Sequence, residues 1–419
     1  MIKRDIYEPL KSHLEQKEIS LIVGPRQAGK TTLMRLLKEN LDKKNKKTLF
    51  LSLDMEADQF FFRSQGLLLQ KIELEMGKEK GFVFIDEIQR KEDAGVFLKG
   101  IYDMDLPYKF VVSGSGSVEL KEKVHESLVG RKRLFEIYPL SFEEFANYRL
   151  NYSYQDKLND FLNLHKADAS KLLDEYLNFG GYPRVVLAQT IDEKRQIIAD
   201  IYQSYLEKDI ILLLNIVKAE RFTHLVRILA SQTGKLVNIS ELSNTLGIAA
   251  QTVKDYLWYL EKTFIITKVT PYFKNIRKEI TKSNVIYFVD LGIKNFATGQ
   301  FGNATHGQPQ GFLFQNFVYN NLRKFLHNKI SSIHFWRTKD KAEVDIVMNT
   351  SKEAIPIEVK YQTLKKPISS RSYKSFISKY RPSKGYIIHL GNEFKEKLAG
   401  TKIFYLPYYK IGNVTKNFQ

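Results

Sequence analysis

The chain contains no cysteine, and its eight histidines are scattered without the spacing of metal ligands. Disulfide bonds and thiolate metal sites are therefore excluded. Long apolar runs are also missing: no stretch of about 18 residues is apolar enough to span a membrane, so no membrane partner is expected. The first residues, MIKRDIYEPL, lack the apolar core of a secretory signal, which points to the cytoplasm.

Acidic residues are scarce relative to basic ones, with 47 Asp and Glu against 65 Lys and Arg and a formal net charge of +18. A basic excess of this size favours a polyanionic partner such as DNA. The excess is spread along the chain, as expected if several domains face one polyanion. Lysine-rich surfaces also occur in proteins that are merely soluble, so the charge alone leaves both interpretations open. The 419 residues, 43% of them hydrophobic, suffice for two or three domains.

A glycine-bounded loop is the most specific motif, since residues 24–32 read GPRQAGKTT. The apolar run Ile19–Val23 precedes this loop and the helix-like stretch Leu33–Leu41 follows it, which is the context of a phosphate-binding loop. Backbone N–H groups of the loop and of the first helical turn would point at phosphate oxygens. The sequence therefore predicts a nucleoside triphosphate site. The expected contacts are Gly24, Pro25, Arg26, Gln27, Ala28, Gly29, Lys30, Thr31 and Thr32.

Two carboxylates after a second apolar run fit the same site. Residues 81–90 read GFVFIDEIQR, and such a run suits a parallel strand buried on both faces. Its carboxyl end is where open α/β sheets bind ligands. We expect Lys30 to reach the β- and γ-phosphates, and Thr31 and Asp86 to hold Mg²⁺. Glu87 is a candidate to orient or deprotonate the attacking water.

Further polar residues lie near the ends of later elements. The run KFVVSGSGS at residues 109–117 places hydroxyls at the end of a third strand, where Ser113 or Ser115 either senses the γ-phosphate or is only a turn residue. Arg131 and Arg133 follow an expected helix. An arginine there can neutralise charge on a γ-phosphate of its own or a neighbouring chain. A solvated or substrate-facing surface is the alternative for both.

The order of strand and helix signals predicts four domains. Strand and helix alternate over residues 1–150, which indicates a doubly wound α/β P-loop domain. Residues 151–220, with the turn FGGYP, are interpreted as a helical lid or connector, residues 221–290 as a winged helix, and residues 291–419 as a C-terminal domain. The strands of the first domain are expected near 19–23, 48–53, 82–86 and 109–113.

Residues 221–290 have the spacing of a helix-turn-helix. Helices are expected over Arg221–Gln232, Ile239–Leu246 with a Ser240 cap, and Ala249–Thr263, followed by two strands. In winged helices that bind DNA, the third helix enters the major groove. Winged helices also serve as lids or protein contacts, and the sequence leaves this open. The residues expected to face bases and phosphates are Gln251, Thr252 and Lys254 on the helix and Lys274, Arg277 and Lys278 on the wing.

The last third contains a separate group of charged residues. Asp345 lies in one expected strand, and Glu358 and Lys360 lie two residues apart in the next, so that they share a face. Two carboxylates and a lysine are the groups that Mg²⁺-dependent phosphodiester cleavage uses. Glu343 shares a face with Asp345 and is a further candidate. A surface charge pair at a sheet edge is the alternative.

These motifs together resemble the archaeal and bacterial AAA-type P-loop ATPases that join a winged helix to a C-terminal domain of unknown function. The match covers nearly the whole chain and is carried by GPRQAGKTTLM, FVFIDEIQR, VVSGSGS, LVGRKRLFEIYPLSFEEF, FGGYP, VIYFVDLGI and EVDIV…IPIEVK. The resemblance implies hydrolysis of ATP, with Mg²⁺, by Lys30, Thr31, Asp86 and Glu87. It also implies an α/β C-terminal domain similar to PD-(D/E)XK nucleases, the fold of several restriction and Holliday-junction-cleaving enzymes.

Two positions depart from the pattern of that family. Gln315 stands where many relatives carry a glutamate, and a neutral amide binds Mg²⁺ more weakly. Val344 replaces the proline that normally precedes the catalytic aspartate. Cleavage is therefore less expected than binding.

The sequence leaves two classes of function open. The first is a DNA-acting ATPase, expected to be a homo-oligomer, that holds duplex or branched DNA while its C-terminal domain binds or cuts it. The second is a nucleotide-controlled switch or scaffold with a protein partner.

Overall fold

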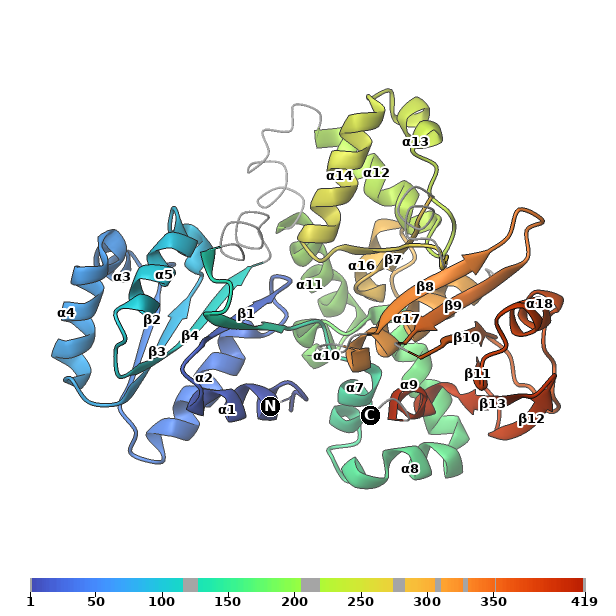
Figure 1. Cartoon of the computed structure of the whole chain (residues 1–419), viewed down its shortest axis with the longest axis horizontal. Helices are drawn as coiled ribbons and strands as arrows, with labels where there is room; N and C mark the ends of the chain where they lie inside the picture. The colour runs from blue at the N-terminus through green and yellow to red at the C-terminus, as the bar shows by residue number, and fades with distance from the viewer. Residues whose placement is uncertain are drawn as a thin grey trace. The chain divides into compact units, whose positions relative to one another are not determined.

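The computed structural model describes residues 2–115, 127–204, 219–273, 283–305, 310–326, 331–350 and 352–416. The chain divides into two compact units (Figure 1). Unit 1 comprises Met1–Pro139, Gln203–Asn215 and Trp258–Ile265, and unit 2 comprises Leu140–Tyr202, Ile216–Leu257 and Ile266–Gln419. Within the described ranges, no helix is both long and apolar enough to cross a bilayer. The division into four domains stays a prediction.

A five-stranded sheet forms the centre of unit 1, with every strand pair parallel and the order β2-β3-β4-β1-β5. The four strands expected from the sequence are confirmed close to their predicted bounds. The apolar runs of β1, β3 and β4 are buried between two layers of helices, while β2, at an edge, is mostly half-buried. The strands are β1 (Ile19–Gly24), β2 (Thr48–Ser52), β3 (Gly81–Asp86), β4 (Tyr108–Ser115) and β5 (Lys132–Glu136).

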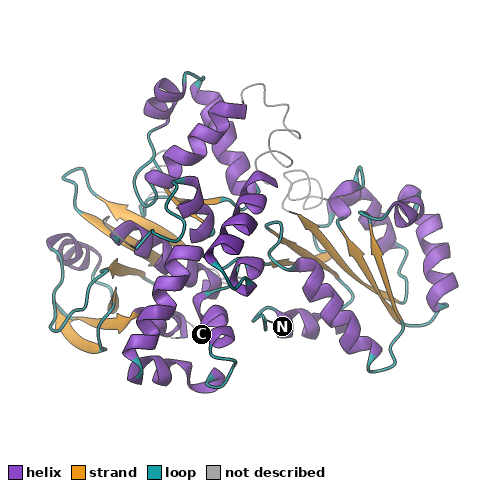
Figure 2. Ribbon diagram, turned by 180° about the vertical axis from the view of Figure 1, so that it is seen from behind, coloured by secondary structure: helices purple, strands orange, loops and turns teal. Residues whose placement is uncertain are grey.

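Helices cover both faces of this sheet (Figure 2). On one face of the sheet, Leu33 and Leu37 of α2 pack with Phe84 of β3. On the other face, Ile72 of α4 and Leu98 of α5 pack with the strand residues whose side chains point away from α2. The described helices of unit 1 are α1 (Tyr7–Ser12), α2 (Lys30–Asp42), α3 (Glu56–Gln59), α4 (Gln65–Met76) and α5 (Ala94–Asp103), with 3-10 turns at His13–Glu15, Phe60–Arg63 and Ile88–Arg90.

Strand β5 was not predicted. It is an edge strand whose sequence, KRLFE, buries only Phe135 fully. An edge strand that exposes part of both faces needs few apolar residues, so its sequence signal is weak.

Unit 2 begins with helices, which confirms the helical pattern of the connector where it is described. The first of them, α7, starts with a capping box in which the side chain of Ser141 accepts from the Glu144 N–H and the Glu144 carboxylate accepts from the Ser141 N–H. These helices are α7 (Phe142–Arg149), α8 (Leu158–Leu164), α9 (Lys166–Phe179), α10 (Pro183–Leu187) and α11 (Ile191–Gln203), with a 3-10 turn at Gln155–Lys157.

Three helices and an antiparallel strand pair follow, as expected for a winged helix, an assignment that stays a prediction. They are α12 (Ala219–Ser231), α13 (Ile239–Leu246), α14 (Ala250–Lys262), β6 (Ile266–Val269) and β7 (Val285–Phe288). The predicted Ser240 cap is wrong, because Asn238 caps α13: its Oδ1 accepts from the N–H groups of Ser240 and Glu241. Both residue types cap helices well, so composition alone does not distinguish them.

The C-terminal part contains a mixed six-stranded sheet in the order β12-β13-β11-β10-β9-β8. The pairs β10-β11 and β11-β13 are parallel and the others antiparallel. Helix α18 packs Tyr373, Phe376 and Ile377 into a core with the sheet. The elements are α16 (Leu291–Ala297), α17 (Gly311–Leu326), β8 (Ser332–Arg337), β9 (Glu343–Asn349), β10 (Ala354–Val359), α18 (Arg371–Tyr380), β11 (Lys384–His389), β12 (Phe394–Leu398), β13 (Thr401–Pro407), a 3-10 turn at Tyr408–Lys410 and α19 (Gly412–Lys416).

The two-glycine turn FGGYP surrounds a buried carboxylate. Asp290 accepts from the Gly181 N–H at 2.8 Å and caps α16 by accepting from the Ile293 N–H at 3.1 Å. Burial raises the pKa of Asp290 to about 6, although these backbone hydrogen bonds oppose the rise. A Cβ atom on Gly181 would lie 2.3 Å from the Leu140 carbonyl oxygen, so the turn tolerates only glycine there.

We predict that Gly181→Ala destabilises unit 2 by about 1–3 kcal/mol, the usual cost of forcing an extra carbon into packed structure. Urea unfolding of the full chain, followed by far-UV circular dichroism, measures this. Gly311→Ala is the matched control, because no atom lies within 4 Å of its added Cβ. Equal unfolding midpoints for the two variants would contradict the prediction.

Candidate nucleotide site and charged clusters

The glycine-bounded loop begins where β1 ends. A Cβ atom at Gly24 would lie 2.1 Å from the carbonyl oxygen of Ile137, so only glycine fits at the start of the loop. At its other end, Gly29 has φ +96°, a left-handed conformation that glycine adopts readily. Helix α2 begins at Lys30, and the first N–H groups of a helix lack partners within it. The loop therefore has the anion-binding arrangement that the motif predicts.

The predicted residues inside the loop differ in burial. Pro25 and Ala28 are buried, Arg26 and Gln27 are half-buried, and Thr32 is exposed on the first turn of α2.

A residue missed by the sequence analysis supports this loop. The Arg4 guanidinium donates to the Ala28 carbonyl at 2.9 Å and to the Tyr138 carbonyl at 2.6 Å, and so ties the loop to the segment after β5. An isolated arginine near the N-terminus carries no motif, so the sequence offered no signal for this role.

The Lys30 side chain lies within the loop. Its ammonium group is buried and donates to the carbonyl oxygens of Gly24 at 3.0 Å and Pro25 at 2.8 Å. The positive charge is therefore held at the place where phosphate oxygens would be bound.

The Asp86 carboxylate joins three elements at the carboxyl edge of the sheet. Thr31 Oγ1 on α2 donates to Asp86 Oδ2 at 2.7 Å, and Ser113 Oγ on β4 donates to Asp86 Oδ1. Asp86 itself ends β3 and is only 3% exposed. The fold thus brings together four of the predicted residues, Lys30, Thr31, Asp86 and Ser113. A carboxylate and a hydroxyl are hard oxygen donors, so Asp86 and Thr31 fit a Mg²⁺ ion.

Glu87 follows directly and has an unusual backbone. Its φ of +57° is uncommon for a residue other than glycine, and such conformations persist only where the surroundings hold them. The side chain is half-buried and accepts a hydrogen bond from the Gln89 amide. Glu87 therefore lies at the same edge of the sheet as Asp86, with its carboxylate oriented by a neighbour.

Arg131 lies at the opposite edge of the sheet. The Ile19 N–H donates to the Arg131 carbonyl at 2.9 Å, and Lys132 is in register with Ile19 in parallel pairing. The glycine loop starts five residues further along β1, roughly 17 Å away at the rise of a strand. The guanidinium instead pairs with Asp103, with Nε 2.7 Å from Oδ1. The interpretation that Arg131 reaches a γ-phosphate of its own chain is therefore wrong, while action on a neighbouring chain stays a prediction.

The charged residues of the C-terminal sheet are close together but are already paired. Lys360 Nζ lies 2.7 Å from Glu358 Oε1, which agrees with their predicted common face. Asp345 Oδ2 accepts from the Val359 N–H at 2.7 Å, and Glu343 pairs with Arg337 at 3.3 Å. Within the described residues, no three His, Cys, Asp or Glu side chains are arranged to hold a metal ion. The expected metal cluster of Glu343, Asp345 and Glu358 is therefore not formed.

The electrostatics of this cluster favour a bound proton. Burial raises the pKa of Asp345 to about 7, and the nearby Glu358 and Glu343 act in the same direction. Burial also raises the pKa of Glu343. Tyr287 of β7 is a neighbour that the sequence analysis missed: it is buried, its hydroxyl has no partner among the described residues, and Asp345 contributes to its raised pKa.

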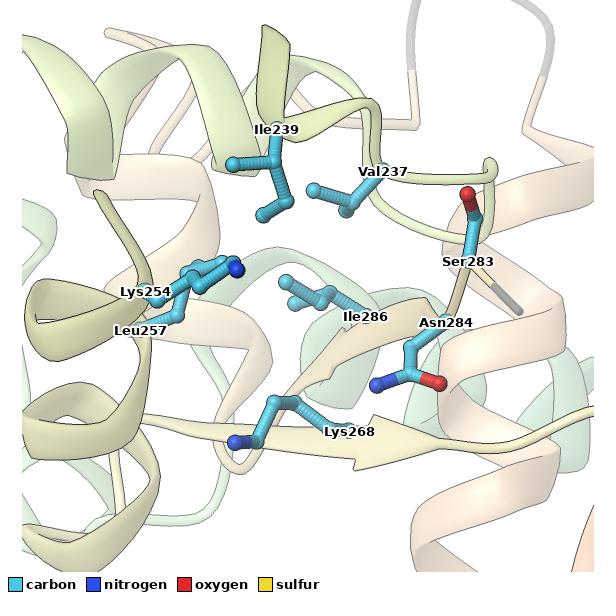
Figure 3. A pocket seen from close by; sticks show the side chains of 8 residues that line it. All are labelled: Val237, Ile239, Lys254, Leu257, Lys268, Ser283, Asn284 and Ile286. Atoms are coloured by element: carbon cyan, nitrogen blue, oxygen red, sulfur yellow. The ribbon is translucent and has the colours of Figure 1, made fainter. Parts of the chain in front are cut away.

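The predicted DNA-facing residues of α14 are accessible. Gln251 and Lys254 are exposed and Thr252 is half-buried, although Gln251 donates to Asp255 at 2.8 Å. Lys254 and Leu257 on one side of a pocket of about 270 Å³ line it together with Ile286 of β7 and Lys268 of β6 (Figure 3). Lys268 lies in the strand expected after the third helix but was not named as a candidate, because the sequence does not show that it lines the same pocket as Lys254. Lys274, Arg277 and Lys278 lie outside the described residues.

Three family models match successive parts of the chain. Residues 16–146 match one described as an AAA domain, residues 170–304 a domain of unknown function (DUF8612), and residues 310–409 a domain of unknown function (DUF4143).

Three curated proteins that are similar to this chain are described only as uncharacterized proteins. An uncharacterized protein of Mycobacterium tuberculosis is 26% identical over 404 residues, covering 96% of this chain and 82% of the relative. One of Haemophilus influenzae is 28% identical over 380 residues, covering 86% and 87%. One of Methanocaldococcus jannaschii is 25% identical over 387 residues, covering 90% and 82%.

Similar solved structures include the replication initiator DnaA bound to AMPPCP and single-stranded DNA, with a TM-score of 0.29, 16% identity and coverage of 62% of this chain and 90% of that chain. Another is Cdc6p from Pyrobaculum aerophilum, with a TM-score of 0.28, 11% identity and coverage of 72% and 97%. TM-scores this low carry no argument about function. The AAA match at residues 16–146 spans every residue of the candidate nucleotide site, from Gly24 to Ser113, so this chain is similar to AAA domains over the whole of that site.

Proposed function

We propose that this chain hydrolyses ATP and couples hydrolysis to holding DNA. The observation that carries the first half is the buried Asp86 carboxylate with the Thr31 and Ser113 hydroxyls on its two oxygens, beside a loop that only glycine can start. This combination supports a triphosphate site, and the AAA match over residues 16–146 supports it independently.

Each residue then has a role that its position supports. Lys30 exchanges the carbonyls of Gly24 and Pro25 for phosphate oxygens and neutralises their charge. Thr31 and Asp86 hold Mg²⁺, which would neutralise further charge on the phosphates. Glu87 orients the attacking water. The Ser113 hydroxyl donates to Asp86 and so connects this carboxylate to β4.

DNA is proposed as the partner on the strength of charge. The chain carries a formal net charge of +18, and the exposed Lys254 lines one pocket together with Lys268. Two lysines that line one pocket favour a phosphate group. Duplex or branched DNA, including a Holliday junction, fits this proposal, as does a homo-oligomer of the chain.

For the C-terminal sheet we propose binding without cleavage. The carboxylates of Glu343 and Glu358 pair with Arg337 and Lys360, and one oxygen of Asp345 accepts from a backbone N–H. These pairings support a set of charge pairs more than a metal-dependent nuclease. A nucleotide-controlled switch with a protein partner is the alternative, favoured by the Gln251–Asp255 hydrogen bond, which places a carboxylate on the helix face proposed to meet DNA.

We predict that Lys30→Ala lowers the ATPase rate at saturating ATP by roughly 100-fold or more, as the loss of a preorganised charge at a transition state does. Phosphate release by the purified full chain measures it. Lys38→Ala is the control, since Lys38 lies on the same helix but pairs with Asp42 at the surface. Equal rates in the two variants would remove the ATP site from the proposal.

Arg131→Ala should leave the ATPase rate of dilute, monomeric chain within about twofold of the parent, because surface arginines contribute little to a distant site. Rates measured against protein concentration test this. A loss confined to concentrations at which the chain assembles would assign Arg131 to a neighbouring chain's site. A loss in the monomer would contradict its placement at the far edge of the sheet.

DNA affinity should fall steeply with salt, with a slope of log K against log salt near −0.9 for each phosphate contacted. Lys254→Ala should reduce the slope by about 1, whereas Lys171→Ala, exposed on α9, should not change it. Fluorescence anisotropy with a labelled duplex gives both slopes. Affinity that does not change with salt, together with an ATPase rate that DNA does not alter, would favour the protein-partner switch.

A further inference from the structure

A groove of about 600 Å³ in unit 2 is lined by residues that belong to none of the sites described so far. Its volume is in the range of ligand sites, roughly 300–1,000 Å³. None of Glu343, Asp345, Glu358 and Lys360 lines it.

The position of the groove follows from the sheet. Strands β10, β11 and β13 are mutually parallel, and the residues just beyond their carboxyl ends form one side of the groove: Tyr361 after β10, Leu390 after β11, and Tyr408 after β13. Helix α9 forms the other side. Carboxyl ends of parallel strands are the usual place of ligand binding in open α/β sheets.

The walls are aromatic and held in place. Tyr408 donates to the Ala169 carbonyl at 2.6 Å, and the Tyr409 hydroxyl accepts from Lys166 at 2.7 Å and donates to Asn163 at 3.0 Å. Both rings are buried, whereas Tyr361 is half-buried and is the tyrosine of this wall that a ligand can reach. Tyr361 packs against Phe314, which also packs against Tyr408, and a ring fixed in this way loses little entropy when a planar group stacks on it.

Three of the polar side chains that line the groove are available to a ligand. Within the described part of the chain, the side chains of Asp174, Lys365 and Asn392 line the groove, are exposed, and form no hydrogen bond or ion pair with another residue. Burial and the nearby Asp174 raise the pKa of Tyr361, so this phenol remains a donor at neutral pH. The rim thus offers an acceptor, a cation, an amide and a hydroxyl around an aromatic wall.

We propose that this groove binds a nucleotide, with its base stacked on Tyr361, the amino or imino N–H groups of the base donating to Asp174, and its phosphate beside Lys365. Stacked bases with polar edges and a phosphate match this set of groups. The nucleotide is either free or an unpaired residue of a nucleic acid strand. The second source rests on the proposed function, since it assumes a DNA-holding chain.

The two charges at the rim make the test specific. If binding were only electrostatic attraction of a polyanion, removal of the Asp174 charge would strengthen it. If the carboxylate accepts from a base, Asp174→Ala weakens binding. Asp168→Ala, exposed on the same helix outside the groove, and Lys366→Ala, next to Lys365 but outside the groove, are matched controls.

The experiment uses the full chain with saturating ADP, so that the glycine loop is occupied. Anisotropy of a labelled single-stranded oligonucleotide of about 12 nucleotides is compared with that of a duplex of equal length, and an unlabelled nucleoside monophosphate competes. We expect Asp174→Ala and Lys365→Ala each to weaken strand binding roughly tenfold, as loss of a charged hydrogen bond does, with both controls within about twofold.

Competition by the monophosphate assigns the groove to a free nucleotide, and strand binding without competition assigns it to an unpaired base. Asp174→Ala binding as tightly as Asp168→Ala, or more tightly, overturns the inference. If duplex binding and its salt dependence persist in that case, the proposed function stands without the groove. If the parent chain binds neither strand, duplex nor monophosphate, the inference and the DNA half of the proposed function both fail, whereas ATP hydrolysis is judged by Lys30→Ala alone.

Discussion

A buried carboxylate must find hydrogen-bond donors, and this requirement organises the candidate nucleotide site. Asp86 ends a strand that is buried on both faces, so its charge is placed where water cannot solvate it. Its donors come from α2 and from β4, elements that are distant in sequence. Because the same residues are the candidates for holding a metal and phosphate, the arrangement that stabilises the fold is also the one that would respond to a nucleotide.

Two other carboxylates, those of Asp290 and Asp345, obtain their hydrogen-bond donors from the backbone. Asp290 accepts from backbone N–H groups of the FGGYP turn and of α16 and so connects these two segments. Neither donor is a side chain that could take part in catalysis. Asp345 takes one backbone N–H and lies near two further carboxylates, and burial raises its pKa to about 7. Donors from hydroxyls, which can also bind a metal, distinguish Asp86 from both.

The resemblance to AAA-type ATPases and the structure agree best at residues 16–146, where local sequence and fold are tightly linked. Strands β1, β3 and β4 are apolar runs whose carboxyl ends carry the polar residues, so periodicity locates them well. The agreement is weaker at β5, an edge strand rich in charge, and at the α13 cap, where Asn238 and Ser240 are equally suited. The connector helices were recognised from their pattern, while the reason for the glycines at 180 and 181 appears only when Asp290 and Leu140 lie beside them.

The sequence by itself determined the glycine-bounded loop between a strand and a helix, the strand that ends in Asp86 and the common face of Glu358 and Lys360, because each depends on spacing within one or two elements. Tertiary structure decided what depends on neighbours: that Arg131 lies at the far edge of the sheet, that Arg337, Lys360 and Val359 already occupy the C-terminal carboxylates, and that Tyr361, Tyr408 and α9 enclose a groove. Parallel pairing brings the ends of separate strands to one edge, and no local pattern states which ends will meet.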